Sequence, residues 1–310
     1  MCLYIGDSIM EEHDLIIIGA GPAGLTAGIY AGREDIKALI LEKGVAGGMQ
    51  SVAPLVGNFP GFKTITGANL SKRMIEQASN YIKINEHEIV NSITLKNGKF
   101  YFKTSKQDYI TKSLILSTGT TYRKLGAEGE EEFIGKGISY CSICDALLFK
   151  NRKVVVIGGG NSAVEHALHL HDVGCDVTII HRRDELRASK HGQDRLREAG
   201  IPIIWNSMVR KIKGDVVVRS ILIYDKEKDE EKEIKVDGVF ISIGEEPNNQ
   251  LAKDIGVELD RSGYIITDKN QRTNIPQVYA AGDVTGGVKQ MVVAASEGAI
   301  AAISAYNDIN

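Results

Sequence analysis

Two segments of the sequence repeat one pattern, in which a run of aliphatic residues is followed by a glycine-rich turn. Residues 14–18 (DLIII) precede GAGPAG, and residues 153–157 (KVVVI) precede GGGNSA. Each segment predicts a buried parallel strand, a tight turn and the start of a helix. The offset is constant, since 139 residues separate Gly19 from Gly158 and also the strands expected after the two helices. The repeat therefore predicts an α/β fold with two dinucleotide-binding units in one chain.

The glycine turns have three positions with separate physical tasks. The first glycine permits the tight turn, and the second lets the backbone approach a pyrophosphate. The third, which is Ala163 in the second turn, lets the helix pack closely on its strand. The helix start then presents free N–H groups and a partial positive charge to the phosphates. The turn residues expected to contact nucleotide are Gly19, Gly21, Pro22, Ala23, Gly158, Gly160, Asn161, Ser162 and Ala163.

The position about 20 residues beyond each glycine turn distinguishes the two units, because an acidic side chain there can bind a ribose 2′-OH. The first unit has Glu42, which suits the free 2′-OH of FAD or NAD. In the second unit the equivalent stretch is basic and contains His181, Arg182, Arg183 and Arg187. Guanidinium groups bind a 2′-phosphate through charge-assisted hydrogen bonds. The alternative is a solvated basic turn, but the placement favours NADPH in the second unit.

A flavin is the expected ligand of the first unit. Two pyridine nucleotides in one chain would have no evident chemical purpose. A flavin accepts a hydride and can release electrons to a disulfide.

One pair of cysteines, Cys141 and Cys144, lies just before the second glycine turn. A single C-x-x-C indicates either a redox-active pair or half of a metal site, and a zinc site would need two more ligands. A short helix starting at the pair would lower a thiol pKa and favour redox chemistry. Asp145 is placed either to exchange a proton with a thiolate or flavin or to cap that helix. Cys175 is expected to be a small buried hydrophobe.

Length and composition limit the other classes of protein. A chain of 310 residues suits about two domains. A net charge of −3 gives no reason to expect a nucleic-acid partner. No apolar run reaches the ~18 residues of a membrane span, and the first residues lack the basic start of a secretory signal. We expect a cytoplasmic protein, no metal, and a dispensable extension at residues 1–12. The charged stretch 225–235 is expected to be a solvated hairpin.

Taken together, the motifs resemble those of the low-molecular-weight thioredoxin reductases over nearly the whole chain. The motifs that carry the resemblance are GAGPAG (19–24), GG-x-Q (47–50), GNFPG (57–61), STG (117–119), C-x-x-C-D (141–145), GGGNSA (158–163), HRR-x-x-x-R (181–187) and AGD (281–283).

The resemblance implies two Rossmann-like dinucleotide-binding domains, with the NADPH domain inserted into a discontinuous FAD domain. The FAD domain would comprise residues 1–120 and 247–310, and the NADPH domain residues 121–246. The resemblance also implies a homodimer, a thioredoxin or glutaredoxin-like partner, and rotation of one domain about linkers near residues 121–126 and 244–248.

The resemblance assigns roles to individual residues of this sequence. Cys144 would face the flavin, Cys141 would attack the partner disulfide, and Asp145 would be the acid or base. The remaining residues implied for the FAD site are Gly48, Gln50, Asn58, Thr118, Gly119, Gly282, Asp283, Gln290 and Met291. The chain departs from the family pattern in three places: the C-S-I-C-D-A sequence, Met49 before Gln50, and Lys289 in place of an arginine.

Two other functions are alternatives to a disulfide reductase that uses NADPH and FAD. An electron-transfer flavoprotein of related fold would lack the C-x-x-C pair. A non-catalytic redox sensor would not need both nucleotide sites, the cysteine pair and Asp145 together.

Overall fold

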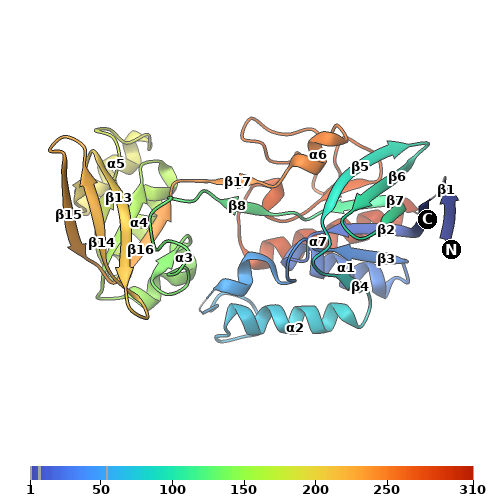
Figure 1. The fold of residues 1–310 in the computed structure, drawn as a ribbon. Helices are drawn as coiled ribbons and strands as arrows, with labels where there is room; N and C mark the ends of the chain where they lie inside the picture. The colour runs from blue at the N-terminus through green and yellow to red at the C-terminus, as the bar shows by residue number, and fades with distance from the viewer. Residues whose placement is uncertain (1, 6–7, 54, 310) are drawn as a thin grey trace. The chain divides into compact units, whose positions relative to one another are not determined.

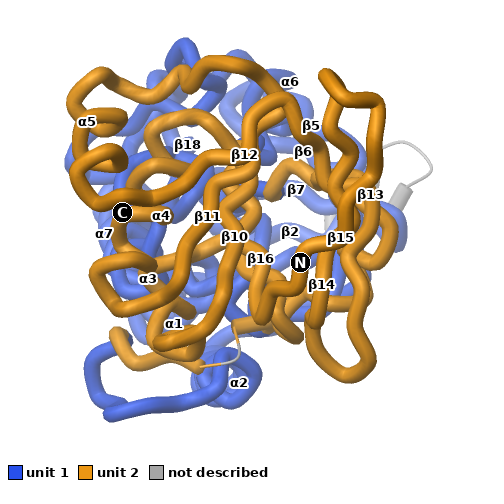
Figure 2. The backbone as a smooth tube through the Cα atoms, turned by 90° about the vertical axis from the view of Figure 1, so that its left-hand side faces the viewer, with its two compact units in different colours: residues 1–51, 59–121, 246–310 blue, residues 52–58, 122–245 orange. Residues whose placement is uncertain are grey.

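A computed structural model of the chain describes residues 2–5, 8–53 and 55–309, which form two compact units (Figures 1 and 2). Unit 1 comprises Met1–Ser51, Phe59–Thr121 and Glu246–Asn310, and unit 2 comprises Val52–Asn58 and Tyr122–Glu245. Unit 1 is thus discontinuous, and most of unit 2 is one insertion into it. The predicted domain limits at residues 1 and 310 lie outside the described residues.

Unit 1 is built on an eight-stranded sheet with the order β4-β3-β2-β7-β6-β5, in which β1 pairs with β2 and β18 with β7. Strands β4, β3, β2, β7 and β18 are parallel, and β5 and β6 extend the sheet with antiparallel pairs. The strands are β1 (Cys2–Ile5), β2 (Ser8–Ile18), β3 (Ala38–Leu41), β4 (Lys83–Asn85), β5 (Val90–Lys96), β6 (Lys99–Thr104), β7 (Asp108–Leu116) and β18 (Val278–Ala280).

The helices of unit 1 pack around this sheet. They are α1 (Pro22–Arg33), α2 (Gly67–Ser79), α6 (Gln250–Asp254) and α7 (Met291–Ile309), with short 3-10 turns at Gly48–Val52 and Asp283–Thr285. Helices α1 and α7 pack against each other, although they come from opposite ends of the chain (Figure 1). Their approach requires a glycine, since a Cβ at Gly298 would lie 2.1 Å from the carbonyl oxygen of Ala23.

The expectation for residues 1–12 was wrong in one respect. Strand β2 begins at Ser8 rather than at residue 14, and Met10, Glu11 and Glu12 pair with the start of β7. Pairing with a strand nearly 100 residues away extends β2 beyond its aliphatic run, which a local pattern could not reveal.

Unit 2 contains a five-stranded sheet with the order β12-β11-β10-β16-β9, in which neighbouring strands are parallel throughout. Its strands are β9 (Ile138–Ser139), β10 (Lys153–Gly158), β11 (Asp176–Ile180), β12 (Ile203–Ile204) and β16 (Gly238–Ser242). Its helices are α3 (Ser142–Asp145), α4 (Asn161–Val173) and α5 (Lys190–Glu198), with a 3-10 turn at Ala146–Phe149.

A second, antiparallel sheet of unit 2 consists of β13 (Ser207–Gly214), β14 (Val218–Asp225) and β15 (Glu230–Lys235). The hairpin predicted for residues 225–235 is confirmed as the β14–β15 turn and strand β15. The two glycine-turn repeats, the parallel sheet of unit 2 and the parallel strands of the unit 1 sheet confirm the predicted α/β class.

The chain leaves unit 1 through β8 (Thr120–Tyr122) and returns through β17 (Glu245–Pro247), and these two strands pair with each other. The pairing continues beyond both strands. The amide of Arg123 donates to the carbonyl of Gly244 at 3.0 Å, and the amide of Asn248 donates to the carbonyl of Gly119 at 3.0 Å. Across the described ranges, no helix is both long and apolar enough to cross a membrane.

Candidate functional site

The first glycine turn joins β2 to α1 and is held by the predicted acidic residue. Gly21 is the N-cap of α1, and Pro22 occupies the first turn, where its missing N–H costs nothing. Glu42 accepts a hydrogen bond from the amide of Ala20 at 2.8 Å through one carboxylate oxygen. Its other oxygen accepts from the amide of Gly44, also at 2.8 Å. The end of β3 therefore fixes the shape of the turn.

A cavity of about 350 Å³ opens beside this turn within unit 1. Its lining includes Gly19, Glu42 and Thr118, three residues predicted for the FAD site, together with Asn248. Two hydrogen bonds join Thr118 to Asn248. The Thr118 hydroxyl donates to the main-chain carbonyl of Asn248 at 2.6 Å, and the side-chain amide of Asn248 donates to the main-chain carbonyl of Thr118 at 2.8 Å. The adjoining Gly119 has a φ of 65°, which favours glycine.

The space beside the turn suits a bound dinucleotide. A Cβ at Gly48 would lie 2.9 Å from the Cα of Gly21, so two backbone segments meet where side chains would block a pyrophosphate. Ala23 is buried in the first turn of α1, and the first N–H groups of a helix have no intrahelical partner and can bind a phosphate. The residues present therefore fit the adenosine and pyrophosphate of FAD.

The AGD segment returns the chain to this sheet through β18. Gly282 adopts a φ of 81°, and its amide donates to Glu297 of α7 at 2.7 Å. Asp283 follows in the 3-10 turn, and burial raises the pKa of its carboxyl group. Burial also raises the pKa of Glu297, against the opposing effect of the hydrogen bond from Gly282.

Glu297 was not predicted from the sequence. An acidic residue flanked by the small, apolar residues of the first half of α7 is the signal that could have identified it.

The other residues predicted for the FAD site are placed less uniformly. Gln50 is buried with its amide nitrogen 3.5 Å from the sulfur of Met74, and its Oε1 has no hydrogen-bond partner in the described parts of the chain. Asn58 is exposed and is part of unit 2, whereas the other residues predicted for the FAD site belong to unit 1. Gln290 directly precedes α7, and Met291 is its first residue.

The second glycine turn joins β10 to α4 in unit 2. Gly158 has a φ of 155°, and a Cβ there would lie 2.2 Å from the carbonyl oxygen of Ser242. Gly160 is the N-cap of α4. Ala163 is fully buried, as close packing of helix on strand requires, whereas Ser162 is exposed.

The basic segment that follows β11 is tied to this turn by main-chain contacts. The amide of Arg187 donates to the carbonyl of Gly159 at 2.7 Å, and the amide of Ser189 donates to the side chain of Asn161 at 2.8 Å. Three arginines of this segment are exposed, namely Arg182, Arg183 and Arg187. The structure thus brings the predicted 2′-phosphate residues beside the predicted pyrophosphate turn.

His181 fills the space between β11 and the glycine turn. A Cβ at Gly159 would lie 2.2 Å from the imidazole carbon Cε1. The ring is buried, and its Nε2 has no hydrogen-bond partner among the residues that the structure describes. Burial lowers the pKa of His181, and main-chain hydrogen bonds with Glu185 and Gly158 oppose this shift; the charges of Arg183 and Arg182 lower the pKa by smaller amounts. A buried polar atom without a partner at this place fits a nucleotide site.

Cys141 and Cys144 form a disulfide at the start of α3. Cys141 is the N-cap of this helix, and its sulfur accepts a hydrogen bond from the amide of Cys144 at 3.2 Å. The same N–H would stabilise a thiolate on Cys141 after reduction. Cys175, in contrast, is a buried free cysteine whose thiol pKa is raised by burial. Within the described residues no group of His, Cys, Asp and Glu is arranged to hold a metal ion.

Asp145 lies at the end of α3 and is buried. Its Oδ2 accepts a hydrogen bond from the hydroxyl of Ser139 at 2.6 Å, and its Oδ1 has no partner in the described chain. Burial raises the pKa of Asp145, and the hydrogen bond from Ser139 opposes that rise. Ser139 also accepts from the amide of Cys141 at 3.0 Å. The sequence did not identify Ser139, although it lies two residues before the pair.

Comparison with known proteins identifies the family. The model of the pyridine nucleotide-disulphide oxidoreductase family matches residues 13–298. Thioredoxin reductase of Listeria innocua is 42% identical, over 93% of this chain and 91% of its own length. The "34.2 kDa protein in rubredoxin operon" of Clostridium pasteurianum is 41% identical, over 95% of this chain and 96% of its own.

A solved structure agrees with these relatives. The crystal structure of thioredoxin reductase from Streptococcus pyogenes has a TM-score of 0.91 to this chain at 36% identity, over 96% of this chain and 98% of that one. The chain belongs to the pyridine nucleotide-disulphide oxidoreductase family, and the predicted resemblance to thioredoxin reductases is confirmed.

Proposed function

We propose that the protein is a thioredoxin-disulfide reductase that takes electrons from NADPH, through FAD and the Cys141–Cys144 disulfide, to a thioredoxin-like protein. The observation that carries the proposal is the disulfide itself. It occupies the start of a helix in the unit that also contains the second glycine turn, and a buried carboxyl group directly follows it. The named thioredoxin reductases among the relatives support the same activity.

Each unit has residues suited to one cofactor. In unit 1, Glu42 and the first glycine turn would hold the adenosine end of FAD, and Asp283 the part nearer the flavin ring. In unit 2, Gly158, Gly160 and the arginines after His181 would hold NADPH. When bound, FAD supplies acceptance of a hydride and the release of electrons to a disulfide.

The chemistry of the protein's own residues is thiol–disulfide exchange. After the pair is reduced, the Cys141 thiolate attacks one sulfur of the partner's disulfide, and a partner thiolate leaves. The Cys144 thiolate then attacks the Cys141 sulfur of this mixed disulfide. That step restores the Cys141–Cys144 bond and releases the partner as a dithiol. Asp145, with its raised pKa, can hold the proton that a leaving or forming thiolate exchanges.

The surface beside the pair suits a protein partner. Ile143, Leu147 and Leu148 are 63%, 77% and 45% exposed around α3. Exposed apolar groups beside a reactive pair offer a protein contact that a small disulfide would not need.

The layout also requires movement, because unit 2 carries both the nicotinamide site and the disulfide that a flavin in unit 1 must meet. The proposed hinges are the paired strands β8 and β17 and their flanks, residues 121–126 and 244–248.

We also expect a homodimer, as the resemblance implies. Light scattering measures this oligomeric state.

The test is a steady-state assay with NADPH and a panel of oxidised thioredoxins. We expect wild-type turnover and, in Cys141→Ser, loss of thioredoxin reduction with retained bleaching of the flavin by NADPH. Cys175→Ala is the matched control and should keep full turnover, because this free thiol is buried and cannot meet a partner disulfide. Thioredoxin reduction by Cys141→Ser, or failure of NADPH to reduce its flavin, would refute the assigned roles.

A further inference from the structure

Trp205, the single tryptophan of the chain, lies where unit 2 is proposed to bind nucleotide. It directly follows β12, which pairs with β11 in the register Ile179 to Ile203 and Ile180 to Ile204. Because β10, β11 and β12 are parallel neighbours, their carboxyl ends share one edge of the sheet. Gly158 ends β10, and His181 and Trp205 follow the other two strands. Parallel sheets of this kind bind their ligands at that edge.

Main-chain hydrogen bonds fix Trp205 beside His181. The amide of His181 donates to the carbonyl of Ile204 at 2.9 Å, and the amide of Ser207 donates to the carbonyl of His181 at 3.0 Å. The two rings meet edge to face, with centroids 6.3 Å apart and planes inclined by 78°. The imidazole in turn lies against Gly159 of the glycine turn. One ring therefore separates Trp205 from the turn.

The surroundings of Trp205 suit a purine nucleotide. Trp205 is 37% exposed, so part of its surface is open to a ligand. The exposed arginines of the neighbouring segment, Arg182 and Arg183, offer positive charge for a phosphate. Nucleobases stack on aromatic side chains whatever the base, and phosphates bind guanidinium groups. An aromatic face beside arginines combines both requirements.

We propose that Trp205 packs against the adenine base of the nucleotide in unit 2, next to the arginines that bind its 2′-phosphate. This inference rests on the proposed assignment of NADPH to unit 2. It adds a contact that no sequence motif indicated. The base would contribute affinity shared by NADPH and NADH, whereas the arginines would contribute the preference between them.

The first measurement uses the emission of this single tryptophan. The FAD-loaded protein is titrated with 2′,5′-ADP, which carries the adenine and the 2′-phosphate but no nicotinamide, and binding is followed in parallel by calorimetry. We expect a saturable change in tryptophan emission with the same Kd as the calorimetric titration. Binding by calorimetry with unchanged emission would overturn the inference and leave the NADPH assignment intact. Absence of binding in both would overturn both.

The second measurement compares variants by calorimetry. Trp205→Leu should raise the Kd about tenfold, which corresponds to about 1.4 kcal/mol, and by the same factor for 2′,5′-ADP and for 5′-ADP. Trp205→Phe should recover most of the affinity because it retains an aromatic face. Arg182→Ala should weaken only 2′,5′-ADP. Val216→Ala, at an exposed position of the same unit, is the control and should bind as wild type. Wild-type Kd values for Trp205→Leu would overturn the inference.

Discussion

Ser139 makes hydrogen bonds both to Asp145 and to the main chain of Cys141, so substituting it should change the pKa of the buried carboxyl group beside the redox pair. Its hydroxyl lies 2.6 Å from the carboxylate of Asp145, and its oxygen also accepts from the amide of Cys141. A donated hydrogen bond stabilises the ionised form of a carboxyl group and so lowers its pKa. Burial acts in the opposite direction and is the larger effect.

Ser139→Ala should therefore raise the pKa of Asp145 further. In the plot of kcat against pH, the limb that reports ionisation of Asp145 should move to higher pH. On the plateau of the profile, kcat should stay within about tenfold of wild type. The measurement is the pH dependence of thioredoxin reduction.

Ser142→Ala is the matched control for this shift. The Ser142 hydroxyl is buried in α3, the helix that ends with Asp145, and has no hydrogen-bond partner in the part of the chain described. Its removal should leave the pH profile in place. A Ser139→Ala profile that coincides with wild type would mean that Asp145 does not control the rate.

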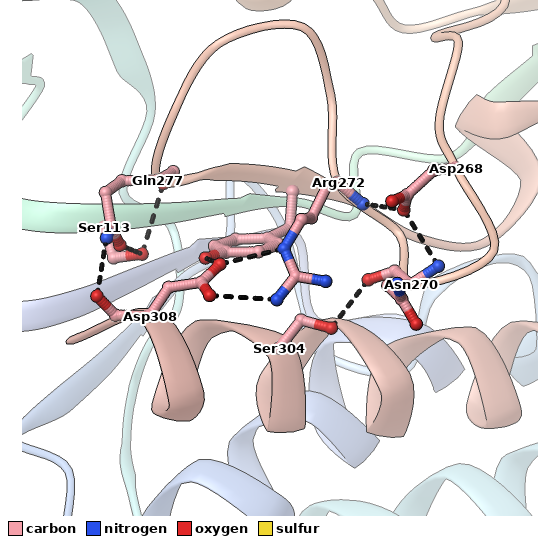
Figure 3. Close-up of polar contacts among 8 residues, drawn as sticks. Ser113, Asp268, Asn270, Arg272, Gln277, Ser304 and Asp308 are labelled. Carbon is pink, nitrogen blue, oxygen red and sulfur yellow. Dashed lines mark hydrogen bonds and ion pairs between the residues drawn. The ribbon is translucent and has the colours of Figure 1, made fainter. Parts of the chain in front are cut away.

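Among elements, α7 shows how a terminal helix is fixed to a sheet. Arg272 makes two hydrogen bonds to Asp308, both 2.9 Å, and Tyr279 of β18 donates to the same carboxylate at 2.6 Å. Gln277 donates to the carbonyl of Asp308 at 2.8 Å, and Ser304 donates to the carbonyl of Asn270 at 2.8 Å (Figure 3). These contacts fix the last turns of α7 to the segment around β18.

Asp308→Asn should lower the free energy of unfolding by about 1 kcal/mol at neutral pH. The half-exposed ion pair of Arg272 with Asp308 is bidentate, and Tyr279 donates to the same carboxylate. The hydrogen bond from Arg272 lowers the pKa of Asp308 in the folded state. The stabilisation is therefore complete above the unfolded pKa of about 3.9 and is lost as the pH falls through the lower folded value.

Urea denaturation of both proteins across pH tests this account. The difference between them should shrink toward acidic pH. Glu76→Gln, which removes the exposed partner of Lys72 on α2, should change little at any pH. A difference for Asp308→Asn that persists unchanged at acidic pH would contradict the ionic origin of the stabilisation.

The same elements show what the sequence could predict. Both strand–turn–helix units were found because their signal is local, with aliphatic runs, glycines and a helix start within about 20 residues. Ser139, Glu297 and Trp205 were missed because their roles depend on tertiary neighbours. Glu297 meets Gly282 across 15 residues, and Trp205 meets His181 across 24.

At the scale of the molecule, the two units divide the chemistry. Unit 1 has the cavity and glycine turn suited to a flavin nucleotide, and unit 2 has the basic nucleotide turn and the disulfide. The two linker strands pair with each other, so the main segment of unit 2, Tyr122–Glu245, begins and ends at one place. Neither unit could carry electrons from a nicotinamide to a thiol by itself, and the account depends on their joint action.

An anaerobic titration of the FAD-loaded protein with NADPH, followed by flavin absorbance, tests that joint action most directly. NADPH donates two electrons, and the flavin and the disulfide accept two each, so wild type should consume about two equivalents per chain before the flavin is fully reduced. A variant with both Cys141→Ser and Cys144→Ser should consume about one. Equal consumption by both proteins would show that electrons from the flavin do not reach the cysteine pair.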